Sequence, residues 1–144
     1  MKHSPEQIKE IEYVLRKISG IIKQKGREIL SEFPITPPQF VALQWLNEEG
    51  DMTIGELSNK MYLAFSTTTD LVDRMEKNGL VERIRDQKDR RVVRIHLLNK
   101  GKEIINEVLE TRRAYLAHIL ESMSQEEVNQ MAISLQQLFK KMNE

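Results

Sequence analysis

Apolar residues recur at alternating steps of three and four near both ends of the chain. This spacing places them on one face of an α-helix, so it predicts amphipathic helices over residues 5–32, 100–122 and 125–142. In the first and last of these the spacing continues as a heptad-like seam. The residues that carry the three stripes are Ile8, Ile11, Leu15, Ile18 and Ile22, then Ile104, Val108, Tyr115, Ile119 and Met123, then Val128, Met131, Leu135, Leu138 and Met142.

These three helices carry more apolar surface than the middle of a 144-residue chain can cover. The same helices from a second copy are the simplest cover, so the pattern favours an intertwined homodimer. The alternative is that the stripes pack against one another within one chain. Residues 1–34 and 100–144 are therefore assigned to a helical dimerisation region.

Helix starts are marked clearly in the sequence. "SPEQ", "TPPQ", "TIGE" and "SQEE" each place a hydroxyl residue three positions before a Glu or Gln. The hydroxyl accepts from a free backbone N–H of the first turn, and the Glu or Gln side chain accepts from the cap's own N–H. The expected caps are Ser4, Thr36, Thr53 and Ser124, and Asn99 is a candidate cap for the helix over 100–122.

The middle of the chain has shorter elements. Apolar spacing predicts helices over residues 37–49, 54–60 and 65–78. "LVERIR" (80–85) and "VVRIHLL" (92–98) then have the alternation of strands, with "DQKDRR" as the loop between them. Helix, turn, helix and a two-stranded hairpin make a winged helix-turn-helix over residues 35–99. The fold class is mainly α, with a β wing.

Composition narrows the possible classes of protein. The chain has no cysteine, which excludes disulfides, thiolate metal sites and cysteine nucleophiles. It has no apolar run long enough for a membrane span, and its polar N-terminus, "MKHSPEQIKEIEYVL", lacks the apolar core of a signal peptide. We expect a cytoplasmic protein with no membrane contact.

Charge is concentrated although the net charge is zero. Residues 74–102 hold ten basic and four acidic side chains, a net charge of +6, and the other segments together balance it. A basic window attracts polyanions because neutralising phosphates releases condensed counterions. The alternative is a solvated charged face with no partner.

The helix over 65–78 is the second of the helix-turn-helix pair, the one that enters the major groove of DNA. Its first turns, "FSTTTDLVDRM", place Thr68, Leu71, Val72 and Met75 inward. Small hydroxyl side chains suit close approach to bases and phosphates, although hydroxyls are also ordinary at helix starts. Asp70 is expected to accept from a cytosine amino group or to hold Arg74. The outward residues, and our DNA-contact candidates, are Ser66, Thr67, Thr69, Asp70 and Arg74.

The hairpin tip supplies further candidates: Lys88, Asp89, Arg90 and Arg91. A guanidinium at such a tip can enter the minor groove, where it senses groove width and negative potential. The carboxylate of Asp89 can hold one edge of Arg91 and leave the other edge pointing outward. The alternative for this pair is a surface ion pair of little energetic consequence.

The stretch "TIGELSNKMYLAFSTTTDLVDRMEKNGLVERIRDQKDRRVVRIHLLNKG" (53–101) resembles the core of the MarR family of bacterial transcription regulators. "LVDRMEKNGLVER" and "DRRVVRIHLLNKG" carry the resemblance, and the flanking helices extend it over essentially the whole chain. By position, Asp89 and Arg91 match the family's wing-tip Asp-x-Arg pair. Likewise, Ser66, Thr67 and Thr69 match contacts of the family's recognition helix.

The resemblance implies a homodimer that binds double-stranded DNA at a palindromic operator, as a repressor rather than an activator. It also implies release by a small aromatic or amphipathic effector. The chain departs from the family pattern at Asp70, where a basic or neutral residue is common, at Phe65, where proline is common, and at Asn99, where threonine is usual.

An effector would lodge between the dimer helices and the winged lobe. The aromatic and sulfur-containing side chains near that junction are candidate walls, and each is equally at home in the core. They are Phe40, Trp45, Met52, Met61, Tyr62 and Phe65.

Other classes of function have little support. No glycine-rich phosphate loop, Ser-His-Asp signature or HExxH motif is present, so we expect neither an enzyme nor a cofactor. His3, His96 and His118 are too widely spaced to suggest a metal site. The alternative to a DNA-binding regulator is a winged helix used only for protein contact or dimerisation.

Overall fold

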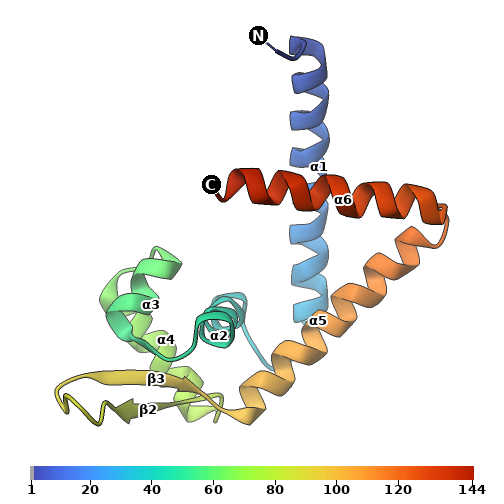
Figure 1. The fold of residues 1–144 in the computed structure, drawn as a ribbon. Coiled ribbons are helices and arrows are strands. Elements are labelled where there is room, and N and C mark those ends of the chain that lie inside the picture. The colour runs from blue at the N-terminus through green and yellow to red at the C-terminus, as the bar shows by residue number, and fades with distance from the viewer. Residues whose placement is uncertain (1) are drawn as a thin grey trace. The chain divides into compact units, whose positions relative to one another are not determined.

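The computed structural model describes residues 2–144 and is mainly helical (Figure 1). The chain divides into two compact units, Met1–Leu109 and Glu110–Glu144. The elements follow in the order α1 (Pro5–Leu30), α2 (Pro37–Glu49), β1 (Met52–Thr53), α3 (Ile54–Met61), α4 (Phe65–Lys77), β2 (Val81–Arg85), β3 (Val93–Leu97), α5 (Asn99–Leu120) and α6 (Gln125–Met142).

The helix starts expected from the sequence are confirmed. Thr36, Thr53 and Ser124 each form a reciprocal capping box with the Gln or Glu three residues later. Ser4 caps α1 by accepting from the backbone N–H of Gln7 at 3.1 Å. The exception is Asn99, which is the first residue of α5, so the carbonyl of Leu98 accepts the first bond of that helix. Local hydrogen-bonding chemistry thus sets four of the helix boundaries.

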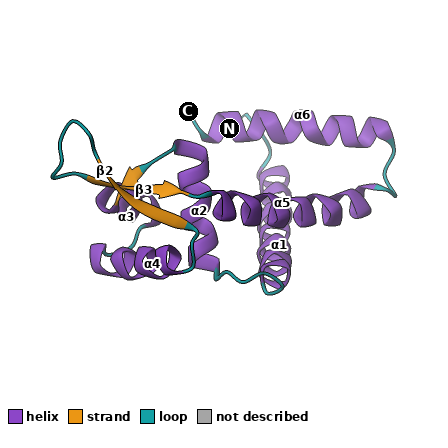
Figure 2. Ribbon diagram, turned by 90° about the horizontal axis from the view of Figure 1, so that it is seen from below, coloured by secondary structure: helices purple, strands orange, loops and turns teal. Residues whose placement is uncertain are grey.

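The sheet has three strands where the sequence predicted two. β2 and β3 form the antiparallel hairpin, with Arg83 opposite Ile95 and Ile84 opposite Arg94. The short β1 pairs with the other edge of β3, so the strand order is β1-β3-β2. β1 thereby fixes the hairpin to the segment that leads into α3, and Figure 2 shows the β2–β3 loop projecting beyond the helices.

The core of the first unit lies between α2, α3, α4 and the sheet, with the end of α1 and the start of α5 packed on it (Figure 1). Apolar burial is the main stabilising contribution to such a core. Its largest fully buried side chains are Leu43, Leu57, Val72, Met75, Leu80, Val81, Ile95, Ile105 and Val108.

Two close contacts fix the edges of this core. Gly101 in the first turn of α5 leaves no room for a side chain, because a Cβ there would meet the carbonyl oxygen of Leu80 at 2.7 Å. On the other side, the ammonium of Lys60 on α3 lies 5.2 Å from the centroid of the Trp45 ring on α2. The first contact brings α5 close to the hairpin, and the second is a cation–π contact between α2 and α3.

Long helices leave apolar faces exposed. No residue of α6 is buried, and its Leu135 and Phe139 are more than half exposed. The stripe of α1 is exposed along most of its length, and only the end of that helix reaches the core. The exposed stripe of α1 comprises Ile8, Ile11, Leu15, Ile18, Ile21 and Ile22.

Candidate nucleic-acid interface

The first turns of α4 have the inward and outward faces that the sequence predicted. Thr68, Val72 and Met75 are buried, and the hydroxyl of Thr68 donates to the carbonyl of Ala64 at 3.1 Å. Ala64 is the N-cap residue and provides no side-chain hydrogen bond. The amide N–H groups at this end of α4 therefore have no side-chain cap.

The outward side chains of α4 differ in how far they are engaged. Thr69 is half-buried and its hydroxyl donates to the carbonyl of Phe65 at 3.0 Å, whereas Ser66 and Thr67 are exposed. Within residues 2–144, no hydrogen bond is seen for the hydroxyls of Ser66 and Thr67. These two are the hydroxyls free to meet a ligand.

Asp70 and Arg74 are both exposed on α4. One expected role for Asp70 was to hold Arg74, but no ion pair joins the two side chains in the described structure. Arg74 is left as an unpaired cation on the outward face. The cytosine-accepting role of Asp70 stays a prediction.

Arg83 on β2 is the main link between the wing and α4. Its guanidinium donates to Asp73 and to Glu76, each at 2.6 Å, and its backbone N–H donates to Glu76 at 3.0 Å. Burial lowers the pKa of Arg83, and the hydrogen bonds to the two carboxylates outweigh this and leave the pKa raised. Sequence analysis counted Arg83 only as part of the basic window, because nothing in the local pattern shows which carboxylates it meets.

The wing tip has the geometry predicted for its Asp-x-Arg pair. Asp89 accepts from Nε of Arg91 at 3.0 Å and from Nη2 at 3.1 Å, and the Arg91 side chain is 91% exposed. These hydrogen bonds from Arg91 hold the pKa of Asp89 below its ordinary value. One edge of the guanidinium is thus held by the carboxylate while the side chain stays open to solvent.

Asp86, at the start of the wing loop, is a residue whose role sequence analysis missed. Its carboxylate accepts from the backbone N–H groups of Lys88 and Asp89 and from the guanidinium of Arg94. These bonds, the one from Lys88 first, lower the pKa of Asp86. An Asp two residues before the loop amides is a known turn-forming pattern, and this signal was available in "DQKDRR".

The basic window is therefore only partly available to a polyanion. Arg83 and Arg94 are paired with carboxylates inside the fold, and Lys100 donates to the carbonyl of Asn78. Among the basic side chains of residues 74–102, those without a protein partner are Arg74, Lys77, Lys88, Arg90 and Lys102.

The six candidate effector walls do not lie on one surface. Phe40 and Met52 belong to the buried core, and Trp45 and Met61 are partly buried against it. The side chains at the turn between α3 and α4 are open, with Tyr62 94% and Phe65 63% exposed. Phe40, Trp45, Met52 and Met61 are therefore core or core-packed side chains, which was the alternative to an effector wall.

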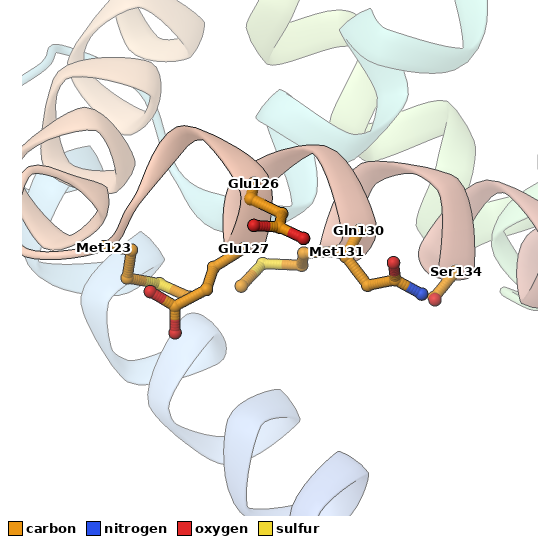
Figure 3. A pocket seen from close by; sticks show the side chains of 6 residues that line it. All are labelled: Met123, Glu126, Glu127, Gln130, Met131 and Ser134. Atoms are coloured by element: carbon orange, nitrogen blue, oxygen red, sulfur yellow. The ribbon is translucent and has the colours of Figure 1, made fainter.

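Open hollows occur within each of the two units. One of about 450 Å³ at the start of α6 is lined by acidic, polar and methionine side chains (Figure 3). Another, of about 410 Å³, lies at the base of the wing and is lined by Asp51, Ile84, Arg85, Asp86, Gln87, Lys88 and Arg94. The acidic hollow on α6 is unsuited to phosphate, whereas the wing hollow combines three basic with two acidic side chains.

Across residues 2–144, no cluster of three metal-ligating side chains occurs. No described helix is both long and apolar enough to span a bilayer.

Comparisons with known proteins identify the fold and the family. Residues 35–93 match the model of the MarR family. The chain is 62% identical to the HTH-type transcriptional regulator YsmB of Bacillus subtilis over 92% of this chain and 91% of that protein. It is 58% identical to a MarR family protein from Bacillus stearothermophilus of known structure, with a TM-score of 0.90 and 99% of each chain covered. The chain belongs to the MarR family.

Membership of the MarR family confirms the resemblance inferred from the sequence. It also confirms the predicted winged-helix fold and the prediction of a transcription regulator rather than an enzyme. A second relative, the HTH-type transcriptional repressor MdtR of Bacillus subtilis, is 30% identical over 92% of this chain and 85% of its own length.

Proposed function

We propose that this MarR-family protein is a homodimeric repressor that binds double-stranded DNA at a palindromic operator. The observation that carries the proposal is the placement of Arg83. By pairing with Asp73 and Glu76, it joins the wing to α4, while Thr67 on α4 and Arg91 on the wing stay exposed. One rigid unit then presents hydroxyls to the major groove and guanidinium groups to the adjacent minor groove.

The proposed contacts divide by the part of the duplex that they meet. Ser66, Thr67, Thr69, Asp70 and Arg74 serve the major groove, and Lys88, Asp89, Arg90 and Arg91 serve the minor groove and the phosphates. Phosphate contacts fix the position of the protein, and base contacts give specificity. The repressor role is supported by MdtR, which is named as one.

The homodimer is supported by the uncovered apolar faces. α1 and α6 each expose a stripe of large apolar side chains, and contiguous apolar surface of this kind marks an interface. A two-fold axis relating two winged domains would present them to half-sites about one helical turn apart. We expect a dimer mass by light scattering at low micromolar concentration.

Release by a small aromatic or amphipathic effector is part of the proposal. A ligand shifts the spacing of the two recognition helices only through its different affinity for the two spacings. Tyr62 and Phe65 are the exposed aromatic candidates, and Trp45 and Met61 are partly accessible. Phe40 and Met52 would take part only through a change in the core.

The test is selection of bound duplexes from a random DNA library, followed by gel-shift titration. Arg91→Ala is expected to weaken binding about tenfold, and Lys140→Ala, which removes an exposed cation from α6, is expected to leave binding unchanged. Affinity is also expected to fall steeply with salt. A protein that selects no duplex, and binds none at low salt, would instead fit the protein-contact module.

A further inference from the structure

We propose that Asp86 and Arg94 are positioning residues that hold the wing tip in its DNA-binding form without touching DNA themselves. The proposal deepens the function proposed above and rests on it. In this proposal Asp86 and Arg94, which lie in the basic window, fix the position of Arg91 through contacts within the protein.

The support begins on two regular elements. Arg94 lies on β3 opposite Ile84, so its backbone is fixed by the ladder of the hairpin. Its Nη1 lies 3.4 Å from Oε1 of Glu56 on α3, and its Nε lies 3.2 Å from Oδ2 of Asp86. Glu56 is itself held in the capping box with Thr53. Arg94 therefore connects the wing loop to α3.

Asp86 connects Arg94 to the backbone of the wing loop. Its side chain is 23% exposed, and its Oδ1 accepts from the N–H of Lys88 at 2.8 Å and of Asp89 at 3.2 Å. Its own N–H donates to the carbonyl of Val92 across the loop at 2.9 Å. The carboxylate of Asp86 thus joins the two loop amides to the Arg94 guanidinium on β3, and the backbone bond to Val92 does not depend on the side chain.

The last link runs from Asp89 to Arg91. The carboxylate of Asp89 accepts from the backbone N–H of Arg91 and from two atoms of its guanidinium. The chain of contacts is therefore Glu56, Arg94, Asp86, Asp89 and Arg91, and each step is a hydrogen bond. A preordered tip loses less conformational freedom on binding than a mobile one.

Charge alone predicts the opposite effect of Asp86. A carboxylate beside a phosphate backbone repels it, so removing Asp86 should tighten DNA binding if only net charge mattered. A positioning role predicts that removing it weakens binding, because the loop and Arg91 lose their fixed geometry. The sign of the change therefore separates the two explanations.

The experiment compares four variants by gel shift on the selected duplex, over a series of salt concentrations. Asp86→Ala is expected to weaken binding about as much as Arg91→Ala, roughly tenfold. Asp86→Asn should lie between wild type and Asp86→Ala, because its amide oxygen still accepts from the two loop amides. Glu82→Ala is the control, since Glu82 is an exposed carboxylate on β2 with no partner among the described residues.

The double variant Asp86→Ala/Arg91→Ala tests whether the two residues act through the same contact. Coupled residues are non-additive, so the double variant is expected to bind no worse than Arg91→Ala alone. The backbone amides of Lys88 and Asp89 should exchange with solvent faster in Asp86→Ala, whereas the dimer mass should stay unchanged.

Three results would overturn the inference while leaving the proposed function intact. These are tighter or unchanged binding by Asp86→Ala, equal binding by Asp86→Asn and Asp86→Ala, or fully additive losses in the double variant. Failure of the wild-type protein to bind any duplex would overturn the proposed function instead, and the positioning role with it.

Discussion

Nη1 of Arg83 on β2 lies 2.6 Å from Oε1 of Glu76 on α4, and the same guanidinium reaches Asp73 one helical turn earlier. This pairing joins the wing to α4, the two elements that we propose enter different grooves of DNA. The Arg83 side chain is only 29% exposed, although Asp73 and Glu76 are more open, so the forked pair is partly screened by solvent.

Replacing Arg83 is expected to loosen the link between wing and recognition helix. Arg83→Met should lower the free energy of unfolding by about 1–3 kcal/mol, because two carboxylates lose a charged donor. Arg83→Lys should also have a lower free energy of unfolding than the wild type, since a single ammonium cannot reproduce the forked donor. Urea unfolding followed by circular dichroism measures both, and full stability in Arg83→Lys would contradict the forked geometry.

The role of Arg83 shows where sequence reasoning ended. The hairpin that contains Arg83 was predicted from apolar alternation, and helix-cap chemistry placed the start of α2 and α6 correctly. The partners of Arg83 lie seven and ten residues earlier on another element, so no local pattern reveals them. Counting charge included Arg83 in the basic window, whereas the fold pairs it with two carboxylates of α4.

Gly101 gives a second prediction, about packing. In Gly101→Ala the new methyl group would meet the carbonyl oxygen of Leu80 at 2.7 Å and Cδ1 of Leu97 at 2.6 Å. Overpacking against backbone is expected to lower the free energy of unfolding by about 1–3 kcal/mol. Thermal unfolding followed by circular dichroism measures the change.

Gly20 in α1 provides the matched control. Nothing lies within 4 Å of a Cβ built there, and alanine is the better helix former. Gly20→Ala should therefore raise the free energy of unfolding by about 0.5–1 kcal/mol. Equal effects at the two glycines would show that close approach at Gly101 is not the determining factor.

Tyr62 gives a third prediction, about backbone strain. It ends α3 in the left-handed region, with φ 55° and ψ 41°, and its side chain is almost wholly exposed. Asparagine occupies this region at lower cost and no packing would be lost, so Tyr62→Asn should raise the free energy of unfolding by up to about 1 kcal/mol. Urea unfolding tests this, and clear destabilisation would mean that the ring has a stabilising contact.

Glu127 gives a fourth prediction, about pH. Hydrogen bonds from Ser124, the backbone N–H first, lower the pKa of Glu127 below its ordinary 4.5. The carboxylate form is favoured in the fold, so its stabilisation of the α6 start is full above pH 4.5 and is lost as pH falls through the lowered pKa. Carboxyl chemical shifts measured by NMR over pH 2–7 report this titration.

The control for this titration is Ser124→Ala, which removes the hydroxyl of the capping box. The pKa of Glu127 should then move only part of the way up toward 4.5, because the backbone N–H of residue 124 still donates to the carboxylate. An unchanged titration in this variant would show that the Ser124 hydroxyl does not contribute to the lowered pKa.

β1 is the element that the sequence did not predict. Met52 and Thr53 are too few residues for any alternation to be visible, and they become a strand only by pairing with Ile95 and Arg94 of β3. The wing loop was predicted as a cationic tip for a related reason. The sequence shows the charges of the loop. Only the fold shows that the Asp86 carboxylate pairs with Arg94 and binds the loop amides.

Trp45 is the only tryptophan in the chain, and it lies on α2 facing the ammonium of Lys60 on α3. Indole fluorescence therefore originates from a single site next to the helix-turn-helix. A change in emission wavelength or quenching on adding DNA or a candidate effector would report a change in the surroundings of Trp45, including its contact with Lys60. The protein thus contains a built-in optical reporter, and it needs no chemical label.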